Sequence, residues 1–165
     1  RGSQPLLGRK QHPVRRGWLD ADQQAALRRV LSSRDTVTLV CGAAGVGKTT
    51  MMQETVEGRE ANGLGVFPMA PPAGTRDVLR KEGFEQGETL DRWLEDSQLQ
   101  LRPQGQVLWI DEAGLVSSKD KVRVFDAAKT NNNRIVLSGD RRQHGPIERG
   151  AALRLLEIDG EARRA

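Results

Sequence analysis

The sequence has few of the residues on which disulfide-stabilised, metal-bound or membrane-spanning proteins depend. Cys41 is the single cysteine among 165 residues, so no internal disulfide can form, and we predict a location in the reducing cytoplasm. No apolar run approaches the ~20 residues that a membrane span needs, and no signal peptide is visible, so we expect no membrane partner. His144 has no partner that argues for a metal site or a catalytic triad. The length suits one domain with a real core.

Acidic residues are absent from the first 17 positions, and this absence explains the net charge. The chain has 26 Lys and Arg against 22 Asp and Glu, a net charge of +4. Without the five basic residues of that segment the remainder carries about −1, so the global charge is weak support for nucleic-acid binding. We interpret residues 1–17 as a flexible basic arm or linker, with DNA binding by the arm as the alternative. Residues 18–157 are expected to form the folded core and residues 158–165 a polar tail.

A glycine-rich stretch matches the phosphate-loop pattern G-x-x-x-x-G-K-[ST] without a mismatch. It lies between an apolar, β-branched segment at 36–41 and a segment at 49–57 with no helix breaker, which is the strand–turn–helix context that the motif requires. Backbone N–H groups of such a loop cradle phosphates, while Lys48 reaches the β- and γ-phosphates and the Thr49 hydroxyl takes one site on Mg²⁺. The residues that we expect to bind the cofactor here are Gly42, Ala43, Ala44, Gly45, Val46, Gly47, Lys48, Thr49 and Thr50.

Two acidic residues end the apolar segment 107–110, which we predict to be a strand. Opposite a phosphate loop, Asp111 is expected to hold Mg²⁺ and Glu112 to orient and deprotonate the attacking water. The alternative is a solvated strand end. A further strand at 134–138 ends in a polar cluster, in which Gln143 is the expected contact for the γ-phosphate.

The remaining pattern alternates strands and helices. Asp20 and Gln23 predict a capping box at the start of a helix, the alternative being that Gln23, Gln24 or both recognise an adenine edge. A strand is expected at 64–70, and helices at 76–82, 89–98, 118–129 and 149–157. This order predicts an α/β fold of the P-loop NTPase class, a RecA-like three-layer α/β/α arrangement with a mostly parallel sheet.

Taken together, the motifs resemble the first RecA-like core of a superfamily 1 helicase. Within that superfamily the chain is similar to the RecD-like branch (SF1B), and in particular to the helicase part of conjugative relaxases of the TraI/TrwC (MobF) type. The spacing of Gly139-Asp140-x-x-Gln143 narrows the match to superfamily 1. The matching segments, in the order of the family, are Leu19–Leu27, Gly42–Thr50, Pro68–Leu79, Thr89–Leu94, Leu108–Ala113 and Leu137–Gln143.

This resemblance implies ATP-driven translocation on single-stranded DNA, with ATP and Mg²⁺ held between two RecA-like cores. It implies that Gln23 contacts adenine and that Lys48, Glu112 and Gln143 are catalytic. The residues near the DNA track would be Thr75, Arg76 and Thr89. Sheets of this family usually gain a further strand beside the phosphate-loop strand; without it, segment 36–41 would become a sheet edge.

The chain departs from the family pattern in several places. Pro72 replaces a small hydroxyl residue, His144 replaces Leu, and Asp91 replaces a His, where an acid disfavours a phosphate. Nothing after Gln143 matches motifs IV to VI, which carry the second core and an arginine finger worth ~10³ to 10⁵ in rate. We expect a core that binds nucleotide, hydrolyses it slowly and does not unwind DNA alone, with the second core and other domains of a parent protein as partners. The alternatives are a stand-alone P-loop ATPase, or a non-catalytic module that binds DNA or a transfer partner.

Overall fold

A parallel β-sheet forms the centre of the computed structural model, which describes residues 6, 13, 16–42, 47–60, 65–70 and 76–140. Within these residues the sheet has five strands in the order β1-β5-β4-β2-β3, and every neighbouring pair is parallel. Parallel strands require crossover connections, which the helices supply. The strands are β1 (Val37–Gly42), β2 (Val66–Ala70), β3 (Glu88–Thr89), β4 (Val107–Ile110) and β5 (Arg134–Asp140).

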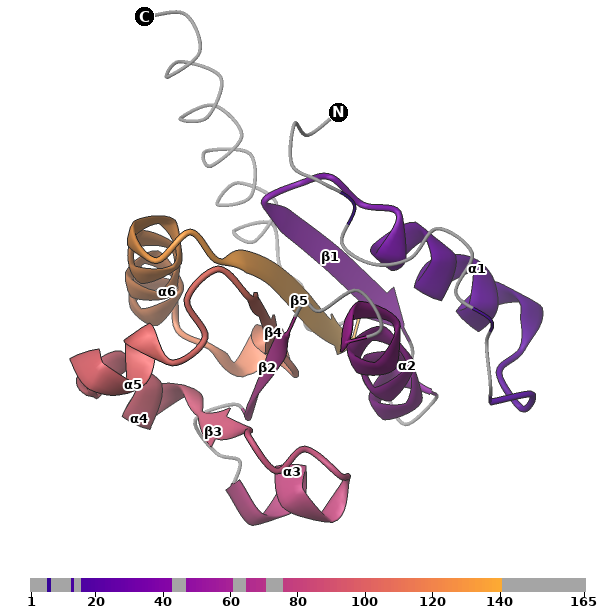
Figure 1. The fold of residues 1–165 in the computed structure, drawn as a ribbon, viewed down its shortest axis with the longest axis horizontal. Coiled ribbons are helices and arrows are strands. Elements are labelled where there is room, and N and C mark those ends of the chain that lie inside the picture. Colours follow the sequence, from indigo (N-terminus) through magenta and orange to yellow (C-terminus); the bar gives the residue numbers. More distant parts are fainter. Residues whose placement is uncertain are drawn as a thin grey trace, which may run out of the picture.

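Helices cover both faces of the sheet (Figure 1). Buried side chains of α1, α2 and α3 form one apolar cluster with the strands, and those of α4, α5 and α6 form a second cluster. The predicted α/β/α architecture is therefore confirmed. The helices are α1 (Ala21–Leu31), α2 (Lys48–Glu60), α3 (Arg76–Lys81), α4 (Leu90–Glu95), α5 (Ser97–Leu101) and α6 (Ser118–Thr130), with a 3-10 turn, η1 (Ala113–Leu115), after β4.

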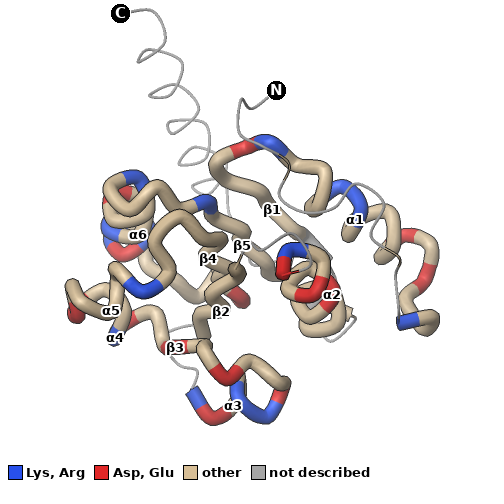
Figure 2. Tube along the Cα trace, viewed as in Figure 1, with Lys and Arg blue, Asp and Glu red and all other residues tan. Residues whose placement is uncertain are grey.

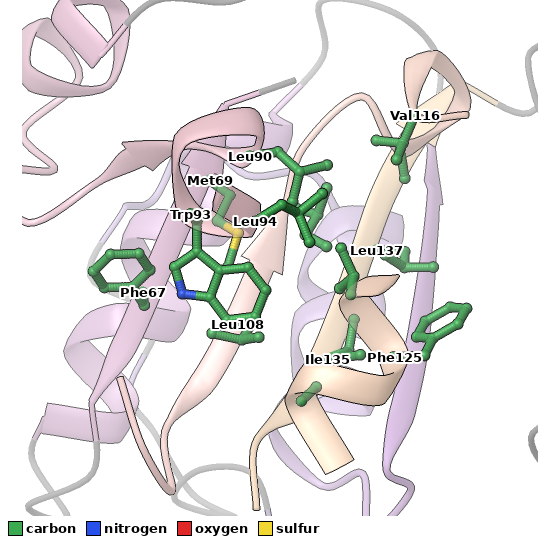
Figure 3. Packing of buried hydrophobic residues seen from close by; sticks show 14 of the residues in the cluster. Phe67, Met69, Leu90, Trp93, Leu94, Leu108, Val116, Phe125, Ile135 and Leu137 are labelled. Atoms are coloured by element: carbon green, nitrogen blue, oxygen red, sulfur yellow. The ribbon is translucent and has the colours of Figure 1, made fainter. Parts of the chain in front are cut away.

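The second cluster is built around Trp93 of α4, whose side chain is fully buried. Figure 3 shows its indole against Phe67 and Met69 of β2 and Leu108 of β4. Burying an aromatic side chain removes about 150–250 Å² from water, a gross stabilisation of about 4–6 kcal/mol. This contact holds α4 against the sheet and so fixes the residues at the start of that helix.

Two predictions about local structure differ from the fold. The single helix expected at 89–98 is divided into α4 and α5, because Asp96 is extended and its carboxylate accepts hydrogen bonds from the N–H groups of Gln98 and Leu99. Aspartate competes with helical hydrogen bonding in this way and favours cap positions. Strand β3 has two residues and was not predicted, since so short a strand has no pattern. The helix expected at 149–157 lies outside the described residues.

Within the described residues β1 lies at one end of the sheet, where it pairs with β5 alone. Leu39 of β1 is 41% exposed at this edge. At the N-terminal side of the core, Arg16 donates its backbone N–H to Glu54 and a guanidinium N–H to Glu57, both on α2. The boundary of the arm at residue 17 stays a prediction. None of the helices in the described part of the chain is long and apolar enough to cross a membrane.

Candidate nucleotide-binding site

The predicted phosphate loop joins the end of β1 to the start of α2. Gly42 is the last residue of β1 and Lys48 is the first of α2, as the motif requires. Gly47 has a φ of +71°, and a Cβ placed on it would lie 2.7 Å from Nε2 of Gln23. Glycine is therefore favoured here for its backbone conformation, and a larger residue would also press on the Gln23 amide. Residues 43–46 and the side chain of Lys48 lie outside the described part, so their predicted phosphate contacts stay predictions.

Gln23 forms the predicted capping box and also lies against the phosphate loop. Its backbone N–H donates to Asp20 Oδ1 at 2.8 Å, and its Oε1 accepts from the Asp20 N–H at 3.0 Å. The capping prediction is confirmed. The amide nitrogen of the same side chain faces Gly47, whereas Gln24 donates to the carbonyl of Leu19, just before α1. Gln23 is thus the glutamine that lies at the loop, and its contact with adenine stays a prediction.

The two acidic residues after β4 lie at the carboxyl end of the sheet, where ligands bind in open α/β folds. Asp111 is half-buried, and its Oδ1 accepts a hydrogen bond of 2.7 Å from the Ser138 hydroxyl of β5. Glu112 is exposed and adopts a left-handed backbone conformation, with φ 46° and ψ 43°. A non-glycine residue in this region is uncommon, and strained residues of this kind cluster at functional sites.

A third carboxylate lies at this corner, which the sequence did not reveal. The Thr49 hydroxyl donates to Glu82 Oε1 at 3.5 Å, and Gln53 Nε2 donates to the Glu82 carbonyl at 2.8 Å. Burial raises the pKa of Glu82 above its ordinary value, and the charge of Asp111 raises it further, against the opposing effect of the Thr49 hydroxyl. Glu82 follows α3 at no fixed spacing from any motif, so only the fold could reveal it. Thr49, Glu82 and Asp111 therefore share one region of the structure.

The oxygen donors at this corner are of the kind that Mg²⁺ selects. Thr49 supplies a hydroxyl and Asp111 a carboxylate, and Mg²⁺ is usually bound by one or two carboxylates together with substrate phosphates. Within the described residues no group of three acidic, histidine or cysteine side chains could hold a metal ion alone. The residues therefore fit a Mg²⁺ ion that arrives with a nucleotide.

Arg76 and Thr89, two of the residues predicted near a DNA track, lie at the opposite end of the sheet from β1. Glu88 of β3 is buried, and it forms ion pairs with Arg76 at 3.7 Å and with Arg92 at 3.2 Å. Thr89 is the N-cap of α4 but makes no side-chain capping bond, so its hydroxyl is not committed to the cap. Thr75 and Gln143 lie outside the described residues.

Charge does not single out a binding face among the described helices. Figure 2 shows basic and acidic residues interspersed on α1, α3 and α6. A nucleic-acid surface dominated by electrostatics presents clustered Lys and Arg. Arg76, which was predicted near the DNA track, and Arg92, which was not, both form ion pairs with Glu88, the residue before Thr89.

Comparison with known proteins identifies the family. A model of the AAA domain matches residues 18–164, which is most of the chain. The chain belongs to the AAA domain family. The match covers the phosphate loop, both acidic residues after β4 and the segment that follows β5.

Relatives of this AAA domain chain are conjugation proteins. It is 35% identical over 144 residues to the conjugal transfer protein TraA of Agrobacterium fabrum, covering 86% of the chain and 13% of the relative. It is 32% identical over 163 residues to the probable conjugal transfer protein TraA of Sinorhizobium fredii, covering 92% of the chain and 15% of the relative. The multifunctional conjugation protein TraI of Escherichia coli is 31% identical over 154 residues, with 87% and 9% covered. These matches confirm the resemblance to TraI-type proteins, and the chain spans less than a sixth of their length.

Proposed function

We propose that this chain is the ATP-binding motor core of a single-stranded-DNA translocase or helicase that acts in conjugation. The observation that carries the proposal is the placement of Thr49 and Asp111 around Glu82, behind a phosphate-loop motif at the carboxyl end of a parallel sheet. The family match supports nucleotide binding, and the conjugation relatives support the DNA-transfer context.

Each residue of the site has a separate task in this proposal. Lys48 neutralises the β- and γ-phosphates, and Thr49 and Asp111 hold Mg²⁺, which supplies positive charge against the phosphate oxygens. Glu112 is exposed at the strand end, where it can reach a water molecule and accept its proton. Gln143 contacts the γ-phosphate and couples nucleotide binding to DNA binding. Gln23 contacts the adenine.

Arg76 and Thr89, two of the proposed DNA-binding residues, lie on the β2–β3 side of the sheet. Thr75, Arg76 and Thr89 would contact the sugar-phosphate backbone of single-stranded DNA. The ion pair with Glu88 restricts the position of the Arg76 side chain. Motifs IV to VI of superfamily 1 have no match after Gln143, and with them the arginine finger has none. We therefore expect slow ATP hydrolysis and no unwinding by this chain alone, with the second RecA-like core supplied by a longer protein.

Single-stranded DNA binding, measured by fluorescence anisotropy with and without Mg²⁺ and an ATP analogue, tests the proposal. A variant with Arg9, Lys10 and Arg15 changed to Gln removes basic charge from the arm but keeps Arg16, which is hydrogen-bonded to Glu54 and Glu57 of α2. Nucleotide-dependent binding that survives these changes supports a DNA track on the core. Binding that is lost with them, or that never responds to nucleotide, contradicts it.

The catalytic part of the proposal is tested with Glu112→Gln. The variant keeps the size of the side chain and removes the base, so bound ATP should persist while the slow turnover of the wild-type chain falls at least tenfold. Equal behaviour of the two proteins would instead favour a non-catalytic module. Strong ATP turnover that DNA does not stimulate would favour a stand-alone ATPase.

A further inference from the structure

Two hydrogen bonds in series link Trp109, Ser138 and Asp111, the first buried and the second partly buried. The indole Nε1 of Trp109 lies 2.8 Å from Ser138 Oγ, and Ser138 Oγ lies 2.7 Å from Asp111 Oδ1. Ser138 is fully buried and Trp109 is 1% exposed. The three residues come from the adjacent strands β4 and β5 and the position that follows β4, and the sheet register places Trp109 beside Val136, two residues before Ser138.

The donor and acceptor capacities of the three side chains fix the direction of these two hydrogen bonds. An indole N–H can only donate, so Ser138 must accept from Trp109. The single hydroxyl hydrogen of Ser138 then goes to the ionised carboxylate of Asp111, since its other acceptor, the Ile110 carbonyl, lies 3.5 Å away. The orientation of the hydroxyl therefore has one solution that satisfies both partners. Bonds to an ionised acceptor are also the stronger kind.

We propose that Ser138 and Trp109 are positioning residues for the Mg²⁺-binding carboxylate of Asp111. The proposal rests on the proposed function, in which Asp111 holds the ion. With Oδ1 held by Ser138, rotation of the carboxylate is restricted and Oδ2 remains for the ion or its water. Partners that orient metal ligands in this way typically change metal affinity by about 10–100-fold when they are removed.

The alternative is that the hydrogen bonds only satisfy a buried indole. In that case loss of the hydroxyl lowers the stability of the fold but leaves the response to Mg²⁺ unchanged. The two roles differ in the ratio of two dissociation constants, those for ADP with Mg²⁺ and for ADP with EDTA. This ratio is independent of a uniform loss of stability as long as the variant is folded.

The experiment compares wild type, Ser138→Ala and Thr55→Val for ADP binding in Mg²⁺ and in EDTA. Thr55 is the matched control, because its hydroxyl is equally buried but donates within α2, to the carbonyl of Met51. We expect Ser138→Ala to weaken ADP binding about tenfold in Mg²⁺ and less than twofold in EDTA, and Thr55→Val to change neither dissociation constant. In an Asp111→Asn background, Ser138→Ala should have no further effect.

A spectroscopic measurement covers the case in which Ser138→Ala folds poorly. In ¹⁵N spectra of the wild-type indole groups, assigned with Trp109→Phe, adding Mg²⁺ to the ADP complex should shift the Trp109 resonance. The Trp93 resonance is the internal reference, since Trp93 packs on the other face of the sheet. Wild-type binding of Mg·ADP with no shift at Trp109, or a Ser138→Ala protein with wild-type Mg²⁺ dependence, overturns the inference. A wild-type chain that binds no nucleotide overturns the proposed function itself.

Discussion

Replacing Glu112 by glycine should yield a more stable protein than replacing it by alanine. Glu112 adopts the left-handed conformation, with φ 46° and ψ 43°. In this region a Cβ clashes with the backbone at a cost of about 1–2 kcal/mol, which alanine retains and glycine avoids. Glycine loses more conformational entropy on folding, about 0.5–1 kcal/mol. The net advantage of Glu112→Gly over Glu112→Ala is therefore about 0.5–1 kcal/mol.

The side chain itself contributes little to this comparison, because Glu112 is exposed and makes no side-chain capping bond. Both variants lack the carboxylate, so both should lose ATP turnover equally. For a chain of this size the difference corresponds to about 1–4 °C in Tm, which thermal and urea unfolding can resolve.

The control is the exposed Glu95, the last residue of α4. There the order should be reversed, with glycine less stable than alanine by up to about 1 kcal/mol, as in other helices. If the glycine variant is less stable than the alanine variant at position 112 by as much as at position 95, Glu112 does not adopt the left-handed conformation in solution. The strain inferred at this strand end is then refuted.

Two further changes test a residue of the site and a residue at the start of β5. Because the pKa of Glu82 is raised in the folded state, ionisation of Glu82 lowers the stability of the fold as the pH rises from the unfolded-state pKa through the folded-state pKa. In thermal unfolding without Mg²⁺, Glu82→Gln should therefore be more stable than wild type at pH 7 and should depend less on pH between pH 4 and 8. Glu85→Gln, at an exposed position nearby, is the control and should not gain stability. Arg134 is buried and donates to the carbonyls of Ser33 and Asp35, so Arg134→Met should cost about 2–4 kcal/mol in urea unfolding, and an unchanged midpoint would contradict these bonds.

Features that depend on neighbouring residues in the chain could be predicted from the sequence. The capping box joins Asp20 to Gln23, three positions apart, and it forms as expected. The phosphate-loop motif lies between a strand and a helix because all three are consecutive, and the apolar segment before Asp111 is a buried strand. In each case the physical cause is local, so the pattern is sufficient.

Features that depend on contacts between residues distant in the chain could not be predicted from the sequence. Glu82 meets Thr49 across 33 positions, and Ser138 meets Asp111 across 27, at spacings set by the packing of α2, α3 and the sheet. The hydrophobic periodicity of the sequence indicates helices and strands, but it does not indicate which residues at such separations come into contact. The proximity of Gln23 to Gly47 is of the same kind, because capping predicts the conformation of the glutamine but not what its amide nitrogen faces.

The most direct test of the account is calorimetric titration of the chain with ADP in Mg²⁺ and in EDTA, for wild type and for Asp111→Asn. Asp111→Asn is nearly isosteric and removes the negative charge that, in our proposal, holds Mg²⁺. We predict that wild type binds ADP more tightly in Mg²⁺ than in EDTA, and that Asp111→Asn loses most of this difference while it still binds ADP in EDTA. Nucleotide binding that is absent in wild type, or a Mg²⁺ effect that survives intact in Asp111→Asn, would contradict the account.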